Sequence, residues 1–266
     1  MISALDKLSA ILRRDLLTAV RHRTGFAITV LGLLTQLAAF YFLSRAIGPG
    51  FRPGGVEYFP FLLVGTGVYT FFVMSTQAFL NTVQEAQQTG TMEVLMTTST
   101  PPAELVVLSS ISAFAGTLVN LAFYLVAGIA LFRAPIHTNA ASLLTVLILS
   151  LMIAMALGIA AATVQITFQK GSALLWLLSS GAWFLSGALF PVETLPHPLA
   201  LIAHAIPLTY AVEGMRMALL QGRSMIAMAP TLAILAGFSL TLLPLALWGL
   251  SHSLRRARQN GTLSFY

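Results

Sequence analysis

Residues 140–168 read AASLLTVLILSLMIAMALGIAAATVQITF, a run with no Asp, Glu, Lys or Arg. A helix needs about 20 apolar residues to cross about 30 Å of hydrocarbon, so this run is long enough to span a membrane. The whole chain agrees, because 57% of its 266 residues are hydrophobic and only 8% are charged, against about 25% charged in a soluble domain. The composition excludes a soluble enzyme and predicts an all-α membrane protein with a single domain over residues 1–266.

Six charge-free runs are long enough to be membrane-spanning helices. They cover residues 25–44, 58–80, 105–132, 140–168, 172–190 and 225–250. The last run contains Pro230 and Pro244, which we expect to bend the helix, as neighbouring helices in a membrane bundle allow. Small residues at every fourth position predict close approach of helices. They are Ser109, Ala113 and Thr117 in the third run and Ala154, Gly158 and Ala162 in the fourth.

Six spans place both termini on the same side of the membrane. Nine of the 14 basic residues then lie on the side of the termini, and residues 1–24 contain five of these nine. The other side has the remaining five basic residues. Basic residues concentrate in cytoplasmic segments, so the sequence predicts a multi-pass protein of the cell membrane with both termini in the cytoplasm. This bias also explains the net charge of +6, and we expect no nucleic-acid partner.

Residues 1–24 are predicted to form an amphipathic helix that lies on the cytoplasmic surface of the membrane. Lys7, Arg14 and Arg21 follow one another at seven-residue intervals and line one face, which suits contact with anionic lipid headgroups. Asp15 interrupts the apolar face, so we expect it to meet a protein partner or Arg14. An ordinary solvated helix with one apolar face is the alternative.

The chain shows no energy source of its own. The six runs contain no ionisable residue that would mark a proton or ion pathway. Their polar residues, such as Gln36, Gln77, Asn120 and Gln165, are interpreted mainly as helix–helix contacts. The sequence has no G-x-x-x-x-G-K-[ST] motif to hold nucleotide phosphates and no cysteine to ligate a metal. Work against a gradient would have to be powered by another subunit.

The loop at residues 85–104 is predicted to dock onto such a subunit. Met92, Leu95 and Met96 are spaced to form one apolar stripe on a short helix, which Pro101 and Pro102 end. Thr89 or Thr91 can cap the start of this helix, and Glu93 favours its positive end. Because the loop has no basic residue to hold it on anionic lipid, we expect it to bind in a groove of a protein.

Two stretches of the sequence resemble the type-2 ATP-binding-cassette (ABC) exporter permeases. Gly90-Thr91-Met92-Glu93-Val94-Leu95, followed by Pro101, is similar to the coupling-helix motif of that family. The pattern after the fifth span is similar as well, and it consists of Ser186-Gly187-Ala188-Leu189-Phe190-Pro191, Leu195-Pro196, Ile206-Pro207-Leu208-Thr209-Tyr210 and Arg216. The interfacial helix, the six spans and the length also match, so the resemblance covers nearly the whole chain.

The resemblance implies a half-transporter without a cofactor of its own. It would pair with a second permease subunit, by default an identical one, and with two separate ATPase subunits that bind ATP and Mg²⁺. The ATPase contacts would come from Gly90, Thr91, Met92, Glu93, Leu95 and Pro101. One departure is that the basic residues often seen around the family's coupling loop are missing here.

The segment at residues 191–224 is predicted to form re-entrant helices on the outer side. Its apolar pieces are too short to span the membrane and too apolar to lie free in water. The resemblance implies that these helices cap the exit path. The residues assigned to this gate are Ser186, Gly187, Phe190, Pro191, Pro196, Pro207 and Tyr210. Glu193, His197 and His204 could be read as metal ligands, but Pro196 and Pro198 interrupt a continuous helix, so no metal site is predicted.

The resemblance also places spans one, two and five beside the translocation path. Candidate path residues are Phe40, Gln77, Trp183 and Phe184, with packing or lipid-facing roles as the alternative. A path without charges favours an amphiphilic or hydrophobic cargo such as a drug, a lipid or a lipid-linked glycan. A membrane-embedded enzyme acting on lipids and a channel remain alternatives. The first lacks clustered Asp residues within the spans, and the second lacks a ring of charge.

Overall fold

The computed structural model describes residues 23–91, 102–168 and 171–260. These residues form α-helices joined by turns and two short 3-10 helices, with no strand among them. The long helices are α2 (Arg23–Ile47), α3 (Tyr58–Gln88), α5 (Pro102–Phe132), α6 (Ala140–Phe168) and α10 (Ala229–Asn260). The shorter ones are α7 (Gly171–Leu185), α8 (His197–His204) and α9 (Pro207–Leu219), with 3-10 helices at Pro53–Gly55 and Val192–Thr194.

Five of the six predicted spans correspond to helices long and apolar enough to cross a membrane. Their spanning segments are Val30–Ile47, Tyr58–Gln88, Val106–Phe132, Ala140–Phe168 and Ala229–Ala257. The predicted span at 172–190 is shorter in the structure, because α7 has 15 residues and ends at Leu185. Gly187 adopts the left-handed backbone conformation (φ +74°), which turns the chain out of the helix. At about 1.5 Å per residue, α7 is about 22 Å long.

Three other helix boundaries differ from the sequence prediction. The helix α2 begins at Arg23, inside the range 1–24 predicted for the interfacial helix, and the rest of that helix lies outside the described residues. The helix α3 continues past residue 80 to Gln88, because the polar residues there remain helical until Gly90 (φ +68°) turns the chain. Pro230 stands in the first turn of α10, where proline starts a helix rather than bending it, whereas Pro244 lies inside.

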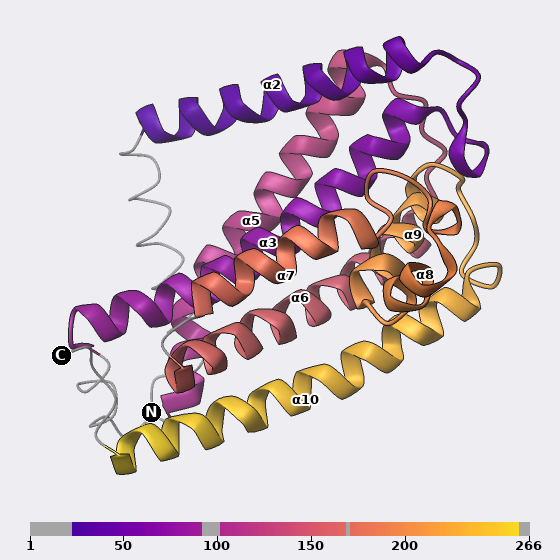
Figure 1. The fold of residues 1–266 in the computed structure, drawn as a ribbon. Helices are drawn as coiled ribbons and strands as arrows, with labels where there is room; N and C mark the ends of the chain where they lie inside the picture. Colours follow the sequence, from indigo (N-terminus) through magenta and orange to yellow (C-terminus); the bar gives the residue numbers. More distant parts are fainter. Residues whose placement is uncertain (1–22, 92–101, 169–170, 261–266) are drawn as a thin grey trace.

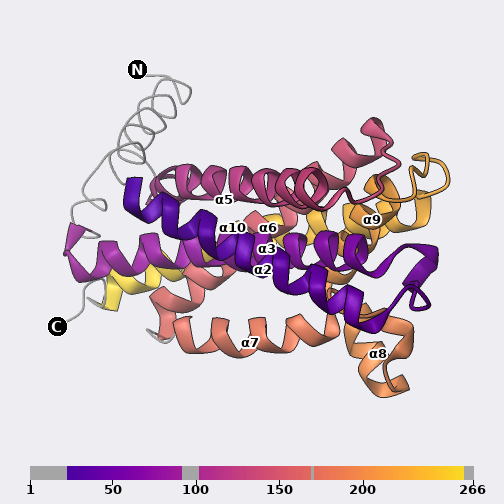
Figure 2. The ribbon, with the colours of Figure 1, turned by 90° about the horizontal axis from the view of Figure 1, so that it is seen from above.

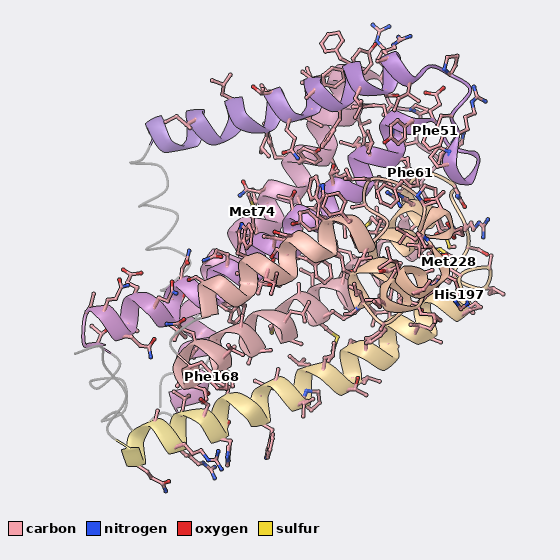
Figure 3. All side chains as sticks on the ribbon, in the orientation of Figure 1. Phe51, Phe61, Met74, Phe168, His197 and Met228 are labelled. Carbon is pink, nitrogen blue, oxygen red and sulfur yellow. The ribbon has the colours of Figure 1, made fainter. Side chains whose placement is uncertain are left out.

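The helices form a bundle with two distinct ends (Figure 1). The start of α2, the end of α3 and the end of α10 lie at one end, named here the coupling-loop end. The helices α8 and α9 gather at the other, named here the α8–α9 end (Figures 1 and 2). In Figure 3, Phe61 and His197 lie at the α8–α9 end, and Phe168 lies toward the coupling-loop end.

The helix α3 is the centre of the bundle. It packs against α2, α5, α6, α7 and α9 and is buried at most positions between Phe59 and Val83. Ala154 and Ala162 on α6 are fully buried, and a Cβ at Gly158 would overlap the ring of Phe79 on α3. This confirms the small-residue ridge predicted in the fourth run. The ridge predicted in the third run holds only in part, because Thr117 is buried but Ala113 is exposed.

Several helices leave large apolar side chains uncovered, α5, α6 and α10 included, and two of these helices lie at margins of the bundle. Figure 1 shows α2 at one margin, and Figure 2 shows α7 at another. On α2 the exposed side chains include Ile28, Leu31 and Phe42, and on α7 they include Trp176, Leu177 and Phe184. The apolar faces of α2 and α7 are therefore not covered by the described parts of this chain.

Candidate functional site

The predicted coupling loop, residues 85–104, overlaps the last turn of α3, which ends at Gln88. The hydroxyl of Thr89 donates a hydrogen bond to the carbonyl of Glu85 (2.8 Å) and lies 2.9 Å from the hydroxyl of Thr91. These contacts close the last turn of α3, and the left-handed backbone of Gly90 (φ +68°) ends the helix. Of the predicted ATPase-contacting residues, the structure describes Gly90 and Thr91. The others, Met92, Glu93, Leu95 and Pro101, lie outside the described residues, as do Lys7, Arg14, Asp15 and Arg21.

Just before this loop, a network of neutral side chains joins α3, α6 and α7. The Gln84 amide nitrogen donates to the hydroxyl of Ser172 (2.6 Å) and to the amide oxygen of Gln165 (3.4 Å). The Gln165 amide nitrogen donates in turn to the amide oxygen of Gln87 (3.2 Å). Gln87 and Gln165 are each 1% exposed. We name Gln84, Gln87, Gln165 and Ser172 the amide network. It confirms Gln165 as a helix–helix contact.

The middle of α7 is held to α3 by one aromatic pair and one hydrogen bond. The Tyr69 hydroxyl donates to the carbonyl of Ser179 (3.0 Å), and its ring meets that of Trp183 edge-on at 4.4 Å. Trp183 therefore packs on α3. The other predicted path residues do not lie together. Phe40 packs in the cluster between α2, α3 and α5, and the side chain of Gln77 forms a hydrogen bond with that of Asn81. The side chain of Phe184 is 58% exposed.

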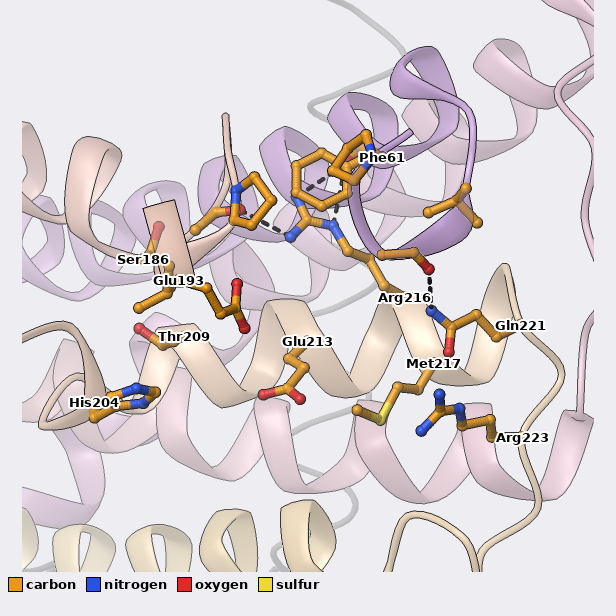
Figure 4. Close-up of a pocket in the computed structure, with 16 residues that line it drawn as sticks. Phe61, Ser186, Glu193, His204, Thr209, Glu213, Arg216, Met217, Gln221 and Arg223 are labelled. Carbon is orange, nitrogen blue, oxygen red and sulfur yellow. Dashed lines mark hydrogen bonds between the residues drawn. The ribbon is translucent and has the colours of Figure 1, made fainter. Parts of the chain in front are cut away.

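At the α8–α9 end, one buried arginine ties three segments together. Arg216 on α9 is 8% exposed. Its Nε and Nη2 donate to the carbonyl of Phe61 on α3 (3.2 and 3.0 Å), Nη1 donates to Gly187 (2.8 Å) and Nη2 to Ala188 (2.9 Å). The guanidinium also lies 3.3 Å from the centroid of the Phe61 ring, a favourable cation–π contact. Figure 4 shows this arrangement, named here the Arg216 latch.

The latch requires a glycine on α3. A Cβ at Gly65 would overlap both Nη2 of Arg216 and the carbonyl oxygen of Ala188. A glycine at this position allows the turn after α7 to lie close against α3. The guanidinium of Arg216 can then reach carbonyls of the turn and of α3. The Tyr58 hydroxyl adds a further bond between these segments, to the carbonyl of Leu189 (3.2 Å).

The helix α9 that carries Arg216 is fixed at both ends. Near its start, the Thr209 hydroxyl donates to the carbonyl of Ala203 in α8 (2.7 Å). At its end, the backbone N–H groups of His137 and Asn139 donate to the carbonyls of Leu219 (3.2 Å) and Ala218 (3.0 Å). These bonds satisfy carbonyls that a helix end otherwise leaves unpaired. The arginine is thus presented by a rigidly held helix.

Burial and charge act together on the ionisable groups of α9. Burial lowers the pKa of Arg216 to about 9, although attraction to Glu193 and Glu213 opposes the shift, so the guanidinium is charged at neutral pH. Burial also raises the pKa of the Glu213 carboxyl, and repulsion from Glu193 adds to this, while His204, Arg216 and Arg223 oppose it. The Glu193 carboxylate therefore lies close enough to Glu213 to help raise the pKa of the Glu213 carboxyl.

A polar cavity of about 350 Å³ lies beside the latch (Figure 4). Of the predicted gate residues, Ser186, Gly187 and Pro191 line it. Phe190, Pro196 and Tyr210 are not among its lining residues. The ring of Tyr210 instead lies 6.2 Å from that of His204. Among the residues that the structure describes, no group of three or more His, Cys, Asp or Glu could hold a metal ion, and this includes Glu193, His197 and His204.

A second cavity, of about 530 Å³, is apolar and lies between α3, α6, α7 and the junction of α8 with α9. It is lined by side chains such as Phe72, Val164, Leu175, Leu185 and Pro207. Neither cavity contains Phe40, Gln77, Trp183 or Phe184.

Sequence reasoning missed the central role of Arg216 and the contribution of Phe61, Gly65 and Glu213. One signal was present. Thr209, Glu213 and Arg216 are spaced four and three residues apart, which places them on one face of a helix. Gln84 and Gln87 were missed because they were assigned to the loop or its margin rather than to a continuing α3.

The profile of the family described as ABC-2 type transporter matches residues 6–220. No curated protein matches the sequence.

Proposed function

The chain belongs to the ABC-2 type transporter family, and from this premise we propose that it exports an amphiphilic or hydrophobic cargo with energy from a separate ATPase. Permeases of this family function with ABC ATPase subunits and normally have no nucleotide-binding site of their own. The sequence agrees, because it has no phosphate-binding motif. The chain is thus the membrane permease of an ATP-driven transporter.

The observation that carries the proposal is the course of α3. It is one continuous helix of 31 residues that contacts the Arg216 latch near one end and runs into the predicted coupling loop at the other. A buried, continuous helix moves as a unit, so a push from the ATPase at Gly90–Leu95, once it has crossed the turn at Gly90, would reach the α8–α9 end along one helix. The coupling-loop end is assigned to the cytoplasm and the α8–α9 end to the outer side.

The uncovered faces of α2 and α7 support a second permease subunit, by default an identical one. Large apolar side chains that remain exposed in one chain are expected at an interface with protein or lipid. The family resemblance places spans one, two and five around the path, and these are α2, α3 and α7. In this assignment α7 is the fifth of six membrane helices, and Phe40, Gln77, Trp183 and Phe184 remain candidates for contact with cargo.

The cargo class rests on the character of the spans and of the apolar cavity. The six predicted spans contain no ionised side chain, and the cavity of about 530 Å³ is lined mainly by aliphatic and aromatic groups. A charged, strongly hydrated solute would find no counter-charge along such a path. A drug, a lipid or a lipid-linked glycan fits better than an ion.

The proposal is tested by purifying the tagged chain from its native membrane in mild detergent and assaying ATPase activity of what accompanies it. We expect a separate ABC ATPase in an amount equal to this chain, with activity that depends on the chain. Recovery of this chain alone, with no stimulated ATPase, would remove the energy source and favour the enzyme or channel alternative.

The role of the coupling loop is tested by Glu93→Ala, with Glu57→Ala as the matched control at the opposite end of α3. We expect Glu93→Ala to lower the stimulation of the ATPase while the chain melts at the temperature of the unmodified protein. Glu57 is an exposed residue that makes no capping hydrogen bond, so its removal is expected to leave the stimulation unchanged. Equal stimulation in both variants would remove Glu93 from the coupling role.

A further inference from the structure

We propose that the cavity beside the Arg216 latch is a binding site for a small zwitterion that carries a primary ammonium group and an anionic group. Free phosphoethanolamine and the headgroup of phosphatidylethanolamine share this chemistry. The site does not depend on the proposed transport function, because binding can be measured in the absence of ATP and of any ATPase.

The size of the cavity suits such a ligand. Its volume of about 350 Å³ lies at the lower end of the range of small-molecule pockets, about 300–1,000 Å³. A water molecule occupies about 30 Å³ in the liquid, so the space is far larger than a bare metal ion requires. A headgroup-sized organic molecule is the better match.

Two buried polar atoms on the cavity wall have no hydrogen-bond partner in the structure. Ser186 is fully buried, yet its hydroxyl is unpaired, and so is the amide oxygen of Gln221. Buried polar atoms are paired in the great majority of cases, and leaving one unpaired is unfavourable. Both atoms can accept a hydrogen bond, so a ligand with N–H donors would satisfy them once the two side chains turn toward the cavity that they line.

One side of the cavity is negative. Glu193 and Glu213 both line it, and Figure 4 shows them near Ser186 and Thr209. The pKa of Glu213 is raised by burial and by Glu193, even though His204, Arg216 and Arg223 face the same carboxyl. Arg216 is already committed, since it donates to the carbonyls of Phe61, Gly187 and Ala188. An ammonium group between the two carboxylates would relieve their repulsion.

The other side of the cavity is positive. Arg223 lies just after the end of α9, near Gln221 and away from Glu193 and Ser186 (Figure 4). Its guanidinium is available to an anionic oxygen, which arginine binds well. With two carboxylates and two guanidiniums the wall carries charges of both signs, so a ligand with a separated ammonium group and anionic group fits better than a simple cation or anion.

The apolar cavity lies directly behind this wall. Ser186, His204 and Thr209 line the polar cavity, while their chain neighbours Leu185, Ala205 and Leu208 line the apolar one. A lipid with its headgroup in the polar cavity would have a large apolar surface within reach for an acyl chain. The test therefore includes a lipid as well as the free headgroup.

The first arm measures binding of O-phosphoethanolamine to the purified full chain in detergent by titration calorimetry. We expect a Kd of about 1 mM or tighter, and at least about tenfold weaker binding of ethanolamine and glycerol phosphate, each of which lacks one charge. Phosphocholine, whose ammonium has no N–H donor, is also expected to bind at least about tenfold more weakly. No heat of binding at about 10 mM O-phosphoethanolamine, or equal binding of all four probes, would overturn the proposal.

The second arm uses variants. Glu213→Gln is expected to weaken O-phosphoethanolamine binding at least about tenfold and Ser186→Ala about threefold, because each removes one acceptor for the ammonium group. Glu57→Gln, an exposed carboxyl outside the cavity, is the control and should bind as the unmodified chain does. If Glu213→Gln fails to fold, Ser186→Ala decides. Unchanged binding in the folded variants would exclude this cavity as the site.

The third arm identifies the source of the zwitterion. Phosphatidylethanolamine and phosphatidylglycerol in nanodiscs are compared for their ability to prevent O-phosphoethanolamine binding. Loss of binding only with phosphatidylethanolamine supports a lipid headgroup as the ligand, and retained binding with both lipids supports a free zwitterion. Equal loss with both lipids contradicts recognition of the ammonium group.

Discussion

The two ends of α3 are held by opposite kinds of chemistry. At the α8–α9 end, a single buried charge on Arg216 meets three backbone carbonyls and the face of Phe61. At the coupling-loop end, the neutral side chains of the amide network meet one another. Backbone carbonyls cannot move independently of their helices or turns, whereas amide side chains can rotate and exchange partners.

This difference indicates how α3 would transmit motion in the proposed transporter. A hydrogen bond from a charged group contributes about 1.5–3 kcal/mol and a neutral one about 0.5–1.5 kcal/mol. The latch is therefore expected to keep α3, α9 and the turn after α7 together as one unit. The amide network is expected to rearrange when the ATPase moves the loop.

Arg216→Met breaks the stronger end and has the largest expected effect. The carbonyls of Gly187 and Ala188 lose their donors, so we expect a loss on the order of 3 kcal/mol in the free energy of unfolding. The measurement is the melting temperature of the detergent-purified chain. Arg52→Met, at an exposed position, is the control. Equal melting temperatures in the two variants would show that the latch does not hold this end together.

Gly65→Ala disturbs the Arg216 latch at the α8–α9 end but keeps the charge of Arg216. The added methyl overlaps Arg216 and Ala188, and overpacking of this kind costs about 1–3 kcal/mol. Gly116→Ala on α5 is the matched control, because a Cβ there meets nothing within 4 Å. Alanine normally favours a helix over glycine by about 1 kcal/mol, so the two variants should shift the melting temperature in opposite directions. A shift of the same sign would contradict the close approach at Gly65.

Gln87→Met tests the weaker end. It removes the acceptor for Gln165 in a position that is 1% exposed, and we expect a loss of about 1 kcal/mol because one neutral bond is lost. Its neighbour Gln88→Met, which is exposed, should melt as the unmodified chain does. The second measurement is ATPase stimulation, which should change in Gln87→Met but not in Gln88→Met. If Gln87→Met lowered the melting temperature as much as Arg216→Met does, the two ends of α3 would not differ in strength.

The smallest expected effect is the pH dependence of Glu213→Gln without ligand. Because the pKa of Glu213 is raised above its ordinary value of 4.5, the unmodified chain gains stability as pH falls through the raised value and loses it again as pH rises. The Gln variant lacks this change. The melting temperatures of both chains are measured between pH 4 and 8. The difference between them at each pH isolates the contribution of Glu213 from those of the other titrating groups. A variant that becomes more stable than the unmodified chain as the pH is lowered would contradict this prediction.

The spans could be predicted because each depends on its own residues. An apolar run of sufficient length is stable in hydrocarbon only as a helix, wherever its neighbours lie. The short α7 shows the limit of this reasoning, since residues 186–190 are apolar enough to continue the helix but the turn at Gly187 directs their carbonyls to Arg216. A hydrophobicity pattern does not show that a distant arginine uses those carbonyls.

The sequence by itself determined the all-α membrane class, five of the long helices and the family, because these follow from local composition and from motifs in fixed order. Only the tertiary structure decided the site at the α8–α9 end. Phe61 and Arg216 lie 155 residues apart, and Ser186 becomes a buried, unpaired hydroxyl only in the packed bundle. The physical reason is that burial and hydrogen-bond pairing are properties of the packed helices, and no single segment carries them alone.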